Sequence, residues 1–209
     1  VLKLAHFGID LGYEIIPIRN VFLILKALYR GSRSIMSNHL VVVGGGQAGV
    51  SLISKLRSMG DTRSISLITA EKYPPYQRPP LSKKYLIGEM RSDRLLLRPT
   101  KWYDDQSVSL YLKNKVSSID IQNKSLLLAS GQSISYSNLA LTTGSEAIKL
   151  PASMGGNLDG VHTLRNIDDV DNIAVQLKSA TSVLVIGGGY IGLEVAAVMS
   201  TLGHDVTIV

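Results

Sequence analysis

The chain has 209 residues, of which 45% are hydrophobic and 18% charged, a balance that favours a soluble, cytoplasmic protein of one domain plus part of another. It has no cysteine, which excludes a disulfide framework, a thiolate metal site and a redox-active cysteine pair within these residues, and we predict no metal site. The net charge is +6, but residues 1–36 hold five Lys/Arg and two acids. The other 17 Lys/Arg face 14 Asp/Glu, too mild an excess to indicate nucleic-acid binding.

Residues 1–36 differ from the rest of the chain, because no strand or glycine turn in them leads into the first motif. Their apolar run, Val21–Leu25, is too short to span a bilayer. We predict that Met36 is the true start and that the upstream residues are an over-extended reading frame. A targeting peptide is the alternative, since the segment is basic and partly amphipathic.

A nucleotide-binding turn is predicted directly after the first strand. The strand is Leu40–Val43, and the turn Gly44–Gly49 has GxGxxG spacing and opens a segment with apolar residues at helical spacing. In such a turn Gly44 allows the chain reversal, Gly46 lets the backbone approach a pyrophosphate, and Gly49 lets the helix pack on the strand. The phosphates rest on free amides at the helix N-terminus.

Two further features extend this site. Ser64–Thr69 reads as the next strand, and Glu71 follows it, 22 residues after Gly49, at the spacing of the acid that binds the ribose hydroxyls. The segment Pro74–Lys83 has four prolines in seven positions, which predicts a rigid, extended path that holds its basic residues at set positions.

The middle of the chain predicts a small antiparallel meander that covers the first sheet. Its expected strands are Val108–Leu112, Val116–Ile121, Ser125–Leu128 and Ile134–Tyr136. We interpret Trp102 as a packing residue. Residues 151–160 read as a linker, after which Asp168-Asp169 marks the start of a helix.

The glycine turn is repeated 143 residues later as Gly187–Gly192, after the apolar strand Val183–Ile186. The sequence therefore predicts an α/β fold with two Rossmann-like nucleotide-binding domains and a meander. We place the domains at residues 37–150 and 151–209. The chain stops inside the strand Val206–Val209, before the residue that separates NAD from NADP, so we expect a C-terminally truncated fragment, inactive by itself.

The Pro74–Lys83 run resembles the PYxRPPLSK segment of FAD-dependent, NADH-using ferredoxin reductases of the putidaredoxin and rubredoxin reductase type, a group that includes apoptosis-inducing-factor relatives. With the two glycine turns, the resemblance covers residues 38–209. It implies that the first turn binds FAD and the second NAD(P)H, with NADH favoured. Leu139–Gly144 resembles the strand that crosses under the flavin, although the usual following arginine is missing and only Lys149 is available.

The implied site residues fall into two groups. The FAD ligands are Gly44, Gly46, Ala48, Gly49, Glu71, Arg78, Lys83, Val116, Thr143 and Gly144. The nicotinamide-nucleotide ligands are Gly187, Gly189, Tyr190, Ile191, Gly192 and Glu194. Glu194, an exposed helix acid by position alone, is implied to pair with Lys83 beside the flavin, which makes these two the catalytic residues.

The implied activity is transfer of electrons from NADH through FAD to a small iron-sulfur or rubredoxin-type carrier, with no membrane span. One alternative is an interaction protein of the apoptosis-inducing-factor kind, and another is a flavin NADH oxidase or disulfide-reductase relative. A disulfide reductase needs a cysteine pair after the ribose acid, where Pro79–Lys84 has none.

Overall fold

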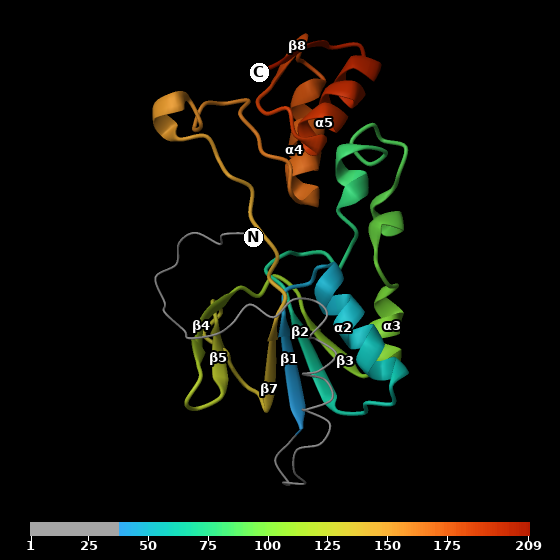
Figure 1. Ribbon diagram of the computed structural model, residues 1–209, viewed down its shortest axis with the longest axis vertical. Helices are drawn as coiled ribbons and strands as arrows, with labels where there is room; N and C mark the ends of the chain where they lie inside the picture. The colour runs from blue at the N-terminus through green and yellow to red at the C-terminus, as the bar shows by residue number, and fades with distance from the viewer. Residues whose placement is uncertain (1–37) are drawn as a thin grey trace. The chain divides into compact units, whose positions relative to one another are not determined.

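The computed structural model describes residues 38–209, and the predictions for residues 1–36 lie outside this range. The first sheet consists of four parallel strands in the order β3-β2-β1-β7 (Figure 1). They are β1 (His39–Val43), β2 (Ser64–Ile68), β3 (Val108–Tyr111) and β7 (Asn138–Leu141). The apolar runs of the central strands β1 and β2 suit a sheet buried on both faces, and Val41 and Val42 are fully buried.

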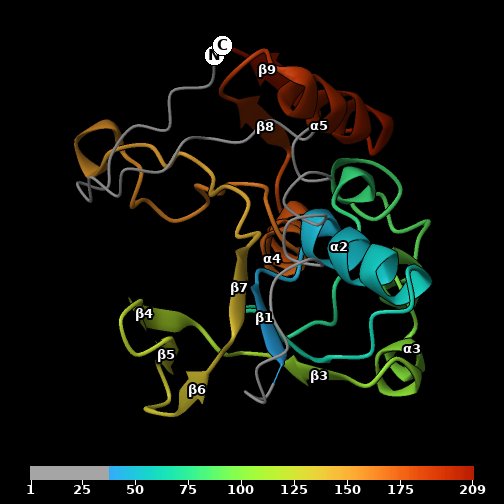
Figure 2. The same ribbon diagram turned by 60° about the horizontal axis from the view of Figure 1, so that its bottom comes forward.

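Helix α2 and the meander cover opposite faces of this sheet, as Figure 2 shows. Successive side chains of a strand point to opposite faces. Val42 lies next to Gly49 of α2 (Gln47–Ser58), whereas Val41 and Val43 pack on Leu126, Leu128 and Ile134 of the meander. The predicted cover over the sheet is therefore confirmed.

The meander has three strands, one fewer than predicted. They are β4 (Val116–Asp120), β5 (Ser125–Leu128) and β6 (Ser133–Ser135), all antiparallel. The residues at 108–111 form β3 instead, which pairs in parallel with β2. The prediction was wrong here because the short helix α3 (Thr100–Asp105) serves as the crossover that a parallel connection requires.

The second glycine turn lies in a smaller parallel pair, β8 (Ser182–Val185) and β9 (Asp205–Ile208), with α5 (Tyr190–Thr201) between them in sequence. The predicted helix after the linker is α4 (Ile167–Leu177), which begins with a capping box between Asn166 and Asp169. The apolar strand predicted before this turn is confirmed as β8, in which Val185 is buried and Leu184 is 58% exposed.

The sequence predicted an extended path for the whole proline-rich segment, but part of the segment is helical. Pro79–Ser82 forms the 3₁₀ helix η1, with prolines at its first positions, and Ser92–Leu95 and Ala152–Met154 form two more such turns, η2 and η3. Proline suits a helix start because its fixed φ is helical and its missing N–H has no partner to lose.

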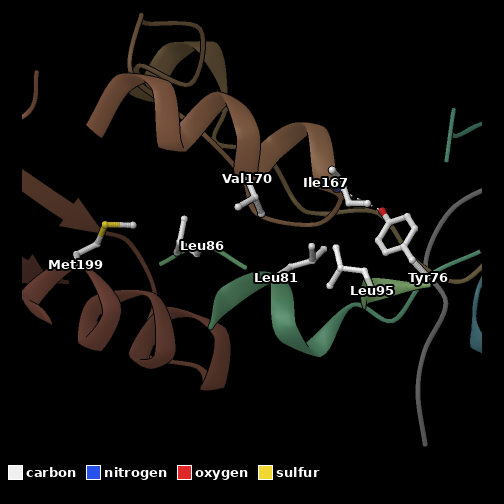
Figure 3. Packing of buried hydrophobic residues seen from close by; sticks show 7 residues of the cluster. All are labelled: Tyr76, Leu81, Leu86, Leu95, Ile167, Val170 and Met199. Atoms are coloured by element: carbon white, nitrogen blue, oxygen red, sulfur yellow. Dashed lines mark hydrogen bonds between the residues drawn. The ribbon is translucent and has the colours of Figure 1, made fainter. Parts of the chain in front are cut away.

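A shared hydrophobic core joins η1 and its surroundings to α4 and α5 (Figure 3). Leu81, Leu86 and Leu95 pack here with Val170 of α4 and Met199 of α5. Residues 76–95 are therefore held against the elements that carry the second turn. No helix within residues 38–209 is long and apolar enough to cross a membrane.

Candidate functional site

The glycines of the first turn have different surroundings. A Cβ on Gly44 would lie 2.2 Å from the Thr142 carbonyl oxygen, and one on Gly49 would lie 2.5 Å from the Gly44 carbonyl oxygen. Gly44 also has a φ of +115°, which L side chains rarely adopt. A Cβ on Gly46 would meet no atom within 4 Å. Gly44 and Gly49 are thus required for packing, while Gly46 faces open space from which a ligand can approach.

The start of α2 can hold an anion. Its N-cap is Gly46, and no side chain among the described residues caps it. The first amides of a helix have no partner inside the helix, and the helix dipole favours negative charge there. A dinucleotide pyrophosphate is an anion that this turn could hold, and the ligand roles of Gly44, Gly46, Ala48 and Gly49 stay predictions.

Glu71 lies just beyond the end of β2 and takes part in a charged cluster. The Arg78 guanidinium donates to Glu71 Oε1, and the Tyr76 hydroxyl donates to Glu71 Oε2. Burial, with the Glu71 hydrogen bond, raises the pKa of Tyr76. Arg78 also donates to the Arg165 carbonyl oxygen at 2.7 Å. The predicted ribose acid and the predicted flavin-site arginine are therefore direct partners.

The loop after β3, which leads to Val116, is bonded to the backbone at the end of β2. The amide of Lys113 donates to the Glu71 carbonyl oxygen, and that of Asn114 to the Thr69 carbonyl oxygen, both at 2.9 Å. Val116 begins β4 two residues later and is half-buried. The adenine contact of Val116 stays a prediction.

Thr143 and Gly144 follow β7, at the same sheet edge as the first turn. Thr142, which the sequence reasoning missed, donates its hydroxyl to the Gly44 carbonyl oxygen at 2.9 Å and fixes the turn. Arg165 was also missed. Its Nε donates to the Ser145 carbonyl oxygen at 2.9 Å, and its guanidinium lies beside Gly144. The sequence has no arginine directly after Gly144, where the family usually has one. The Arg165 guanidinium, from further along the chain, lies in this region instead.

The implied pair between Lys83 and Glu194 is present. Lys83 Nζ lies 2.7 Å from Glu194 Oε2, and the two side chains are 48% and 31% exposed. Ser82, also missed, donates its hydroxyl to the same Glu194 oxygen at 2.6 Å. These hydrogen bonds, from Lys83 first and Ser82 second, lower the pKa of Glu194. A carboxylate held ionised thus lies between the 3₁₀ turn η1 and the helix of the second glycine turn.

The second turn repeats the geometry of the first. Gly187 has a φ of +110°, and a Cβ on Gly192 would lie 2.0 Å from the Gly187 carbonyl oxygen. Gly189, like Gly46, would meet nothing within 4 Å. Tyr190 and Ile191, at the start of α5, are 89% and 49% exposed, so they are open to a ligand. No cluster of His, Asp or Glu within residues 38–209 could hold a metal ion.

The fold and these two turns define the class, an α/β protein with two dinucleotide-binding turns. The chain belongs to the pyridine nucleotide-disulphide oxidoreductase family, whose model matches residues 38–209. Two similar relatives are a ferredoxin–NAD(P)(+) reductase of Sphingomonas, 39% identical, and a rubredoxin–NAD(+) reductase of Pseudomonas putida, 38% identical, each matched over 81% of this chain. The chain is also similar to the reductase in a covalent putidaredoxin reductase–putidaredoxin complex, with a TM-score of 0.77, 35% identity and 82% of this chain covered.

The chain spans about two-fifths of these proteins. It covers 41% of the Sphingomonas reductase, 44% of the Pseudomonas reductase and 42% of the reductase in the putidaredoxin complex.

Proposed function

We propose that the protein containing this chain is a cytoplasmic flavoprotein reductase that takes electrons from NADH through FAD to a small iron-sulfur or rubredoxin-type carrier. The observation that carries this proposal is the Lys83–Glu194 contact, which joins the proline-rich segment to the helix of the second glycine turn. Bound flavin would link the two-electron donor NADH to a one-electron carrier, because flavin accepts electrons as a pair and can release them singly.

FAD is assigned to the first turn. Gly46 and the free amides of α2 would receive its pyrophosphate, with Gly44, Ala48 and Gly49 shaping the turn. Glu71 would bind the adenosine ribose, and its partner Arg78 would line the flavin site. The Val116 backbone would meet the adenine. Thr143 and Gly144 would line the FAD site, where the Arg165 guanidinium adds positive charge beside them.

The nicotinamide nucleotide is assigned to the second turn. Gly187, Gly189 and Gly192 would form its pyrophosphate cradle, and Tyr190 and Ile191 would contact the nucleotide. Lys83 and Glu194 would flank the reacting rings and fix the local charge. A bound dinucleotide would exclude water from the pair, whose attraction grows as the local dielectric constant falls.

The carrier proposal is supported by the names of similar proteins, two of which reduce ferredoxin or rubredoxin and one of which was solved with putidaredoxin. A protein of the apoptosis-inducing-factor kind would share both turns and the Lys83–Glu194 pair, so the acceptor must be tested directly.

The test uses the full-length protein purified with its cofactor. We expect a flavin spectrum that extracts as FAD and rapid flavin bleaching by NADH in stopped flow. We also expect two molecules of an added rubredoxin or [2Fe–2S] ferredoxin to be reduced for each NADH oxidised, because NADH gives two electrons and each carrier takes one. NADPH in place of NADH measures nucleotide preference, and a reaction without carrier gives the background. Flavin bleaching with no carrier reduction would favour the interaction-protein alternative, and absence of flavin would reject the site.

A further inference from the structure

We propose that Ser82 is a positioning residue for Glu194, and that Ser82, rather than Lys83, holds this carboxylate in its observed orientation. The proposal deepens the function proposed above, on which its effect on NADH oxidation rests. The anchoring contact itself is a property of the folded chain and can be tested without turnover.

The hydroxyl of Ser82 has one strong acceptor. Its Oγ lies 2.6 Å from Glu194 Oε2 and 3.5 Å from the Pro79 carbonyl oxygen. Hydrogen bonds between oxygens are 2.5–3.0 Å long, so the single proton of the hydroxyl points to the carboxylate. Ser82 is 4% exposed, which keeps water from competing for that proton.

The backbone fixes where this hydroxyl points. Ser82 ends η1, whose first positions are Pro79 and Pro80, and proline removes most of the freedom in φ. Leu81, next to Ser82, is 1% exposed and packs in the shared core with α4 and α5 residues. Ser82 also has only one side-chain torsion that moves its oxygen. The position of the Ser82 hydroxyl is therefore set by its own segment and does not depend on Glu194.

Lys83 is held much less firmly. Its side chain is 48% exposed, and its ammonium group divides its donors between Glu194 and the Pro79 carbonyl oxygen at 3.3 Å. A lysine must order four torsions to make such a pair, and exposed ion pairs contribute little for this reason. Lys83 therefore supplies charge, whereas the direction of the carboxylate comes from Ser82.

The anchor acts on one oxygen only. Both Ser82 and Lys83 contact Oε2, and no protein group in the described range bonds to Oε1. Lys83 is the charged side chain in contact with Glu194. Without the Ser82 hydroxyl, the Glu194 carboxylate could change its orientation while it stays in contact with Lys83. The pKa of Glu194 would then rise toward its ordinary value.

The test is a pair of double-mutant cycles in the full-length protein, measured by urea unfolding. Ser82→Ala should lower the folding equilibrium constant about tenfold or more, as expected for a buried hydrogen bond to a charged group. Adding Glu194→Gln should cost much less in the Ser82→Ala background than in wild type. Lys83→Met should lower the constant less than about fivefold and couple weakly to Glu194→Gln.

Flavin reduction by NADH gives a second readout. Ser82→Ala should slow reduction with little change in NADH affinity, and should move the acid limb of its pH profile upward, because Glu194 then protonates at higher pH. Ser66→Ala is the matched control, since Ser66 is a buried serine on β2 whose hydroxyl contacts His39. It should lower stability without coupling to Glu194→Gln and without moving the acid limb.

Additive unfolding effects of Ser82→Ala and Glu194→Gln, or stronger coupling of Glu194 to Lys83 than to Ser82, would overturn the proposal. If the unfolding cycle shows the coupling but NADH fails to reduce the flavin, the anchor stands and the proposed function fails.

Discussion

The glycines of the first turn share a motif but differ in physical role. Gly49 lies against the backbone of Gly44, and its Cβ would fall 2.5 Å from a carbonyl oxygen that cannot move aside. Gly46 has free space on the corresponding side. The spacing of the motif predicts different roles for these glycines, and the structure shows the close packing contact at Gly49 and the open space at Gly46.

We expect Gly49→Ala to destabilise the protein by about 1–3 kcal/mol, the usual cost of forcing a methyl group into a packed site. Gly46→Ala should leave the unfolding midpoint nearly unchanged but weaken FAD binding, because the methyl group occupies the approach path. Urea unfolding and FAD titration of the apoprotein measure the two effects. Equal loss of stability in both variants would contradict this division of roles.

Some site residues could be predicted because a motif records them, and others could not because their contacts arise only in three dimensions. Glu71 and Arg78 were found from spacing and resemblance. Arg165 was missed because it reaches the loop after Gly144 from 21 residues further along the chain. Ser82 and Thr142 were missed because serine and threonine are common, and only the direction of each hydroxyl shows its partner.

At the scale of single elements, strands that precede a glycine turn were predicted well and the proline segment was not. A buried run followed by GxGxxG has one favourable geometry. In contrast, a four-residue run such as Val108–Tyr111 does not record whether its partner is parallel or antiparallel, because that depends on the connection before it. Prolines restrict φ equally in an extended path and in a 3₁₀ turn, so Pro79 and Pro80 allowed both.

Helix α4 offers a test of local capping. Asn166 accepts a hydrogen bond from the Asp169 amide at 2.9 Å, and Asp169 accepts one from the Asn166 amide at 3.0 Å. Asn166→Ala should lower the free energy of unfolding by about 1 kcal/mol. Asn157→Ala, in an exposed loop, is the control and should have little effect in the same urea titration. If the two variants unfold alike, the capping box contributes no stability.

The whole molecule should be most stable between mild acid and mild alkali. The pKa of Asp168 is lowered, chiefly by its hydrogen bond with Lys72, and that of Glu194 by Lys83. A lowered pKa gives stability above the unfolded value, near pH 4, that is lost as the pH falls through the folded value.

The pKa shift has the opposite direction at two tyrosines, the buried Tyr103 and the half-buried Tyr85. Burial raises the pKa of Tyr85 and of Tyr103 to about 12 each, with Asp171 adding to the effect at Tyr85. The contribution of these tyrosines to the free energy of unfolding is complete below pH 10. It disappears as the pH rises toward the pKa that they have in the folded protein. Urea midpoints measured from pH 3 to pH 11 should therefore fall at both ends. A midpoint that stays constant down to pH 3 would contradict the carboxylate contacts, and Asp168→Asn should flatten the acid side.

The position of β7 in the first sheet also has a kinetic consequence. Leu40 of β1 pairs with Asn138 of β7, so two neighbouring strands are separated by almost a hundred residues of chain. Contacts so distant in sequence form slowly, because the entropy of closing the loop is lost before any pairing energy is gained. During synthesis on the ribosome, the backbone groups of β1 that pair with β7 remain unpaired until β7 has emerged from the exit tunnel. The protein is therefore most exposed to aggregation while it is still being made, and a chaperone that shields β1 in this interval should raise the yield of folded product.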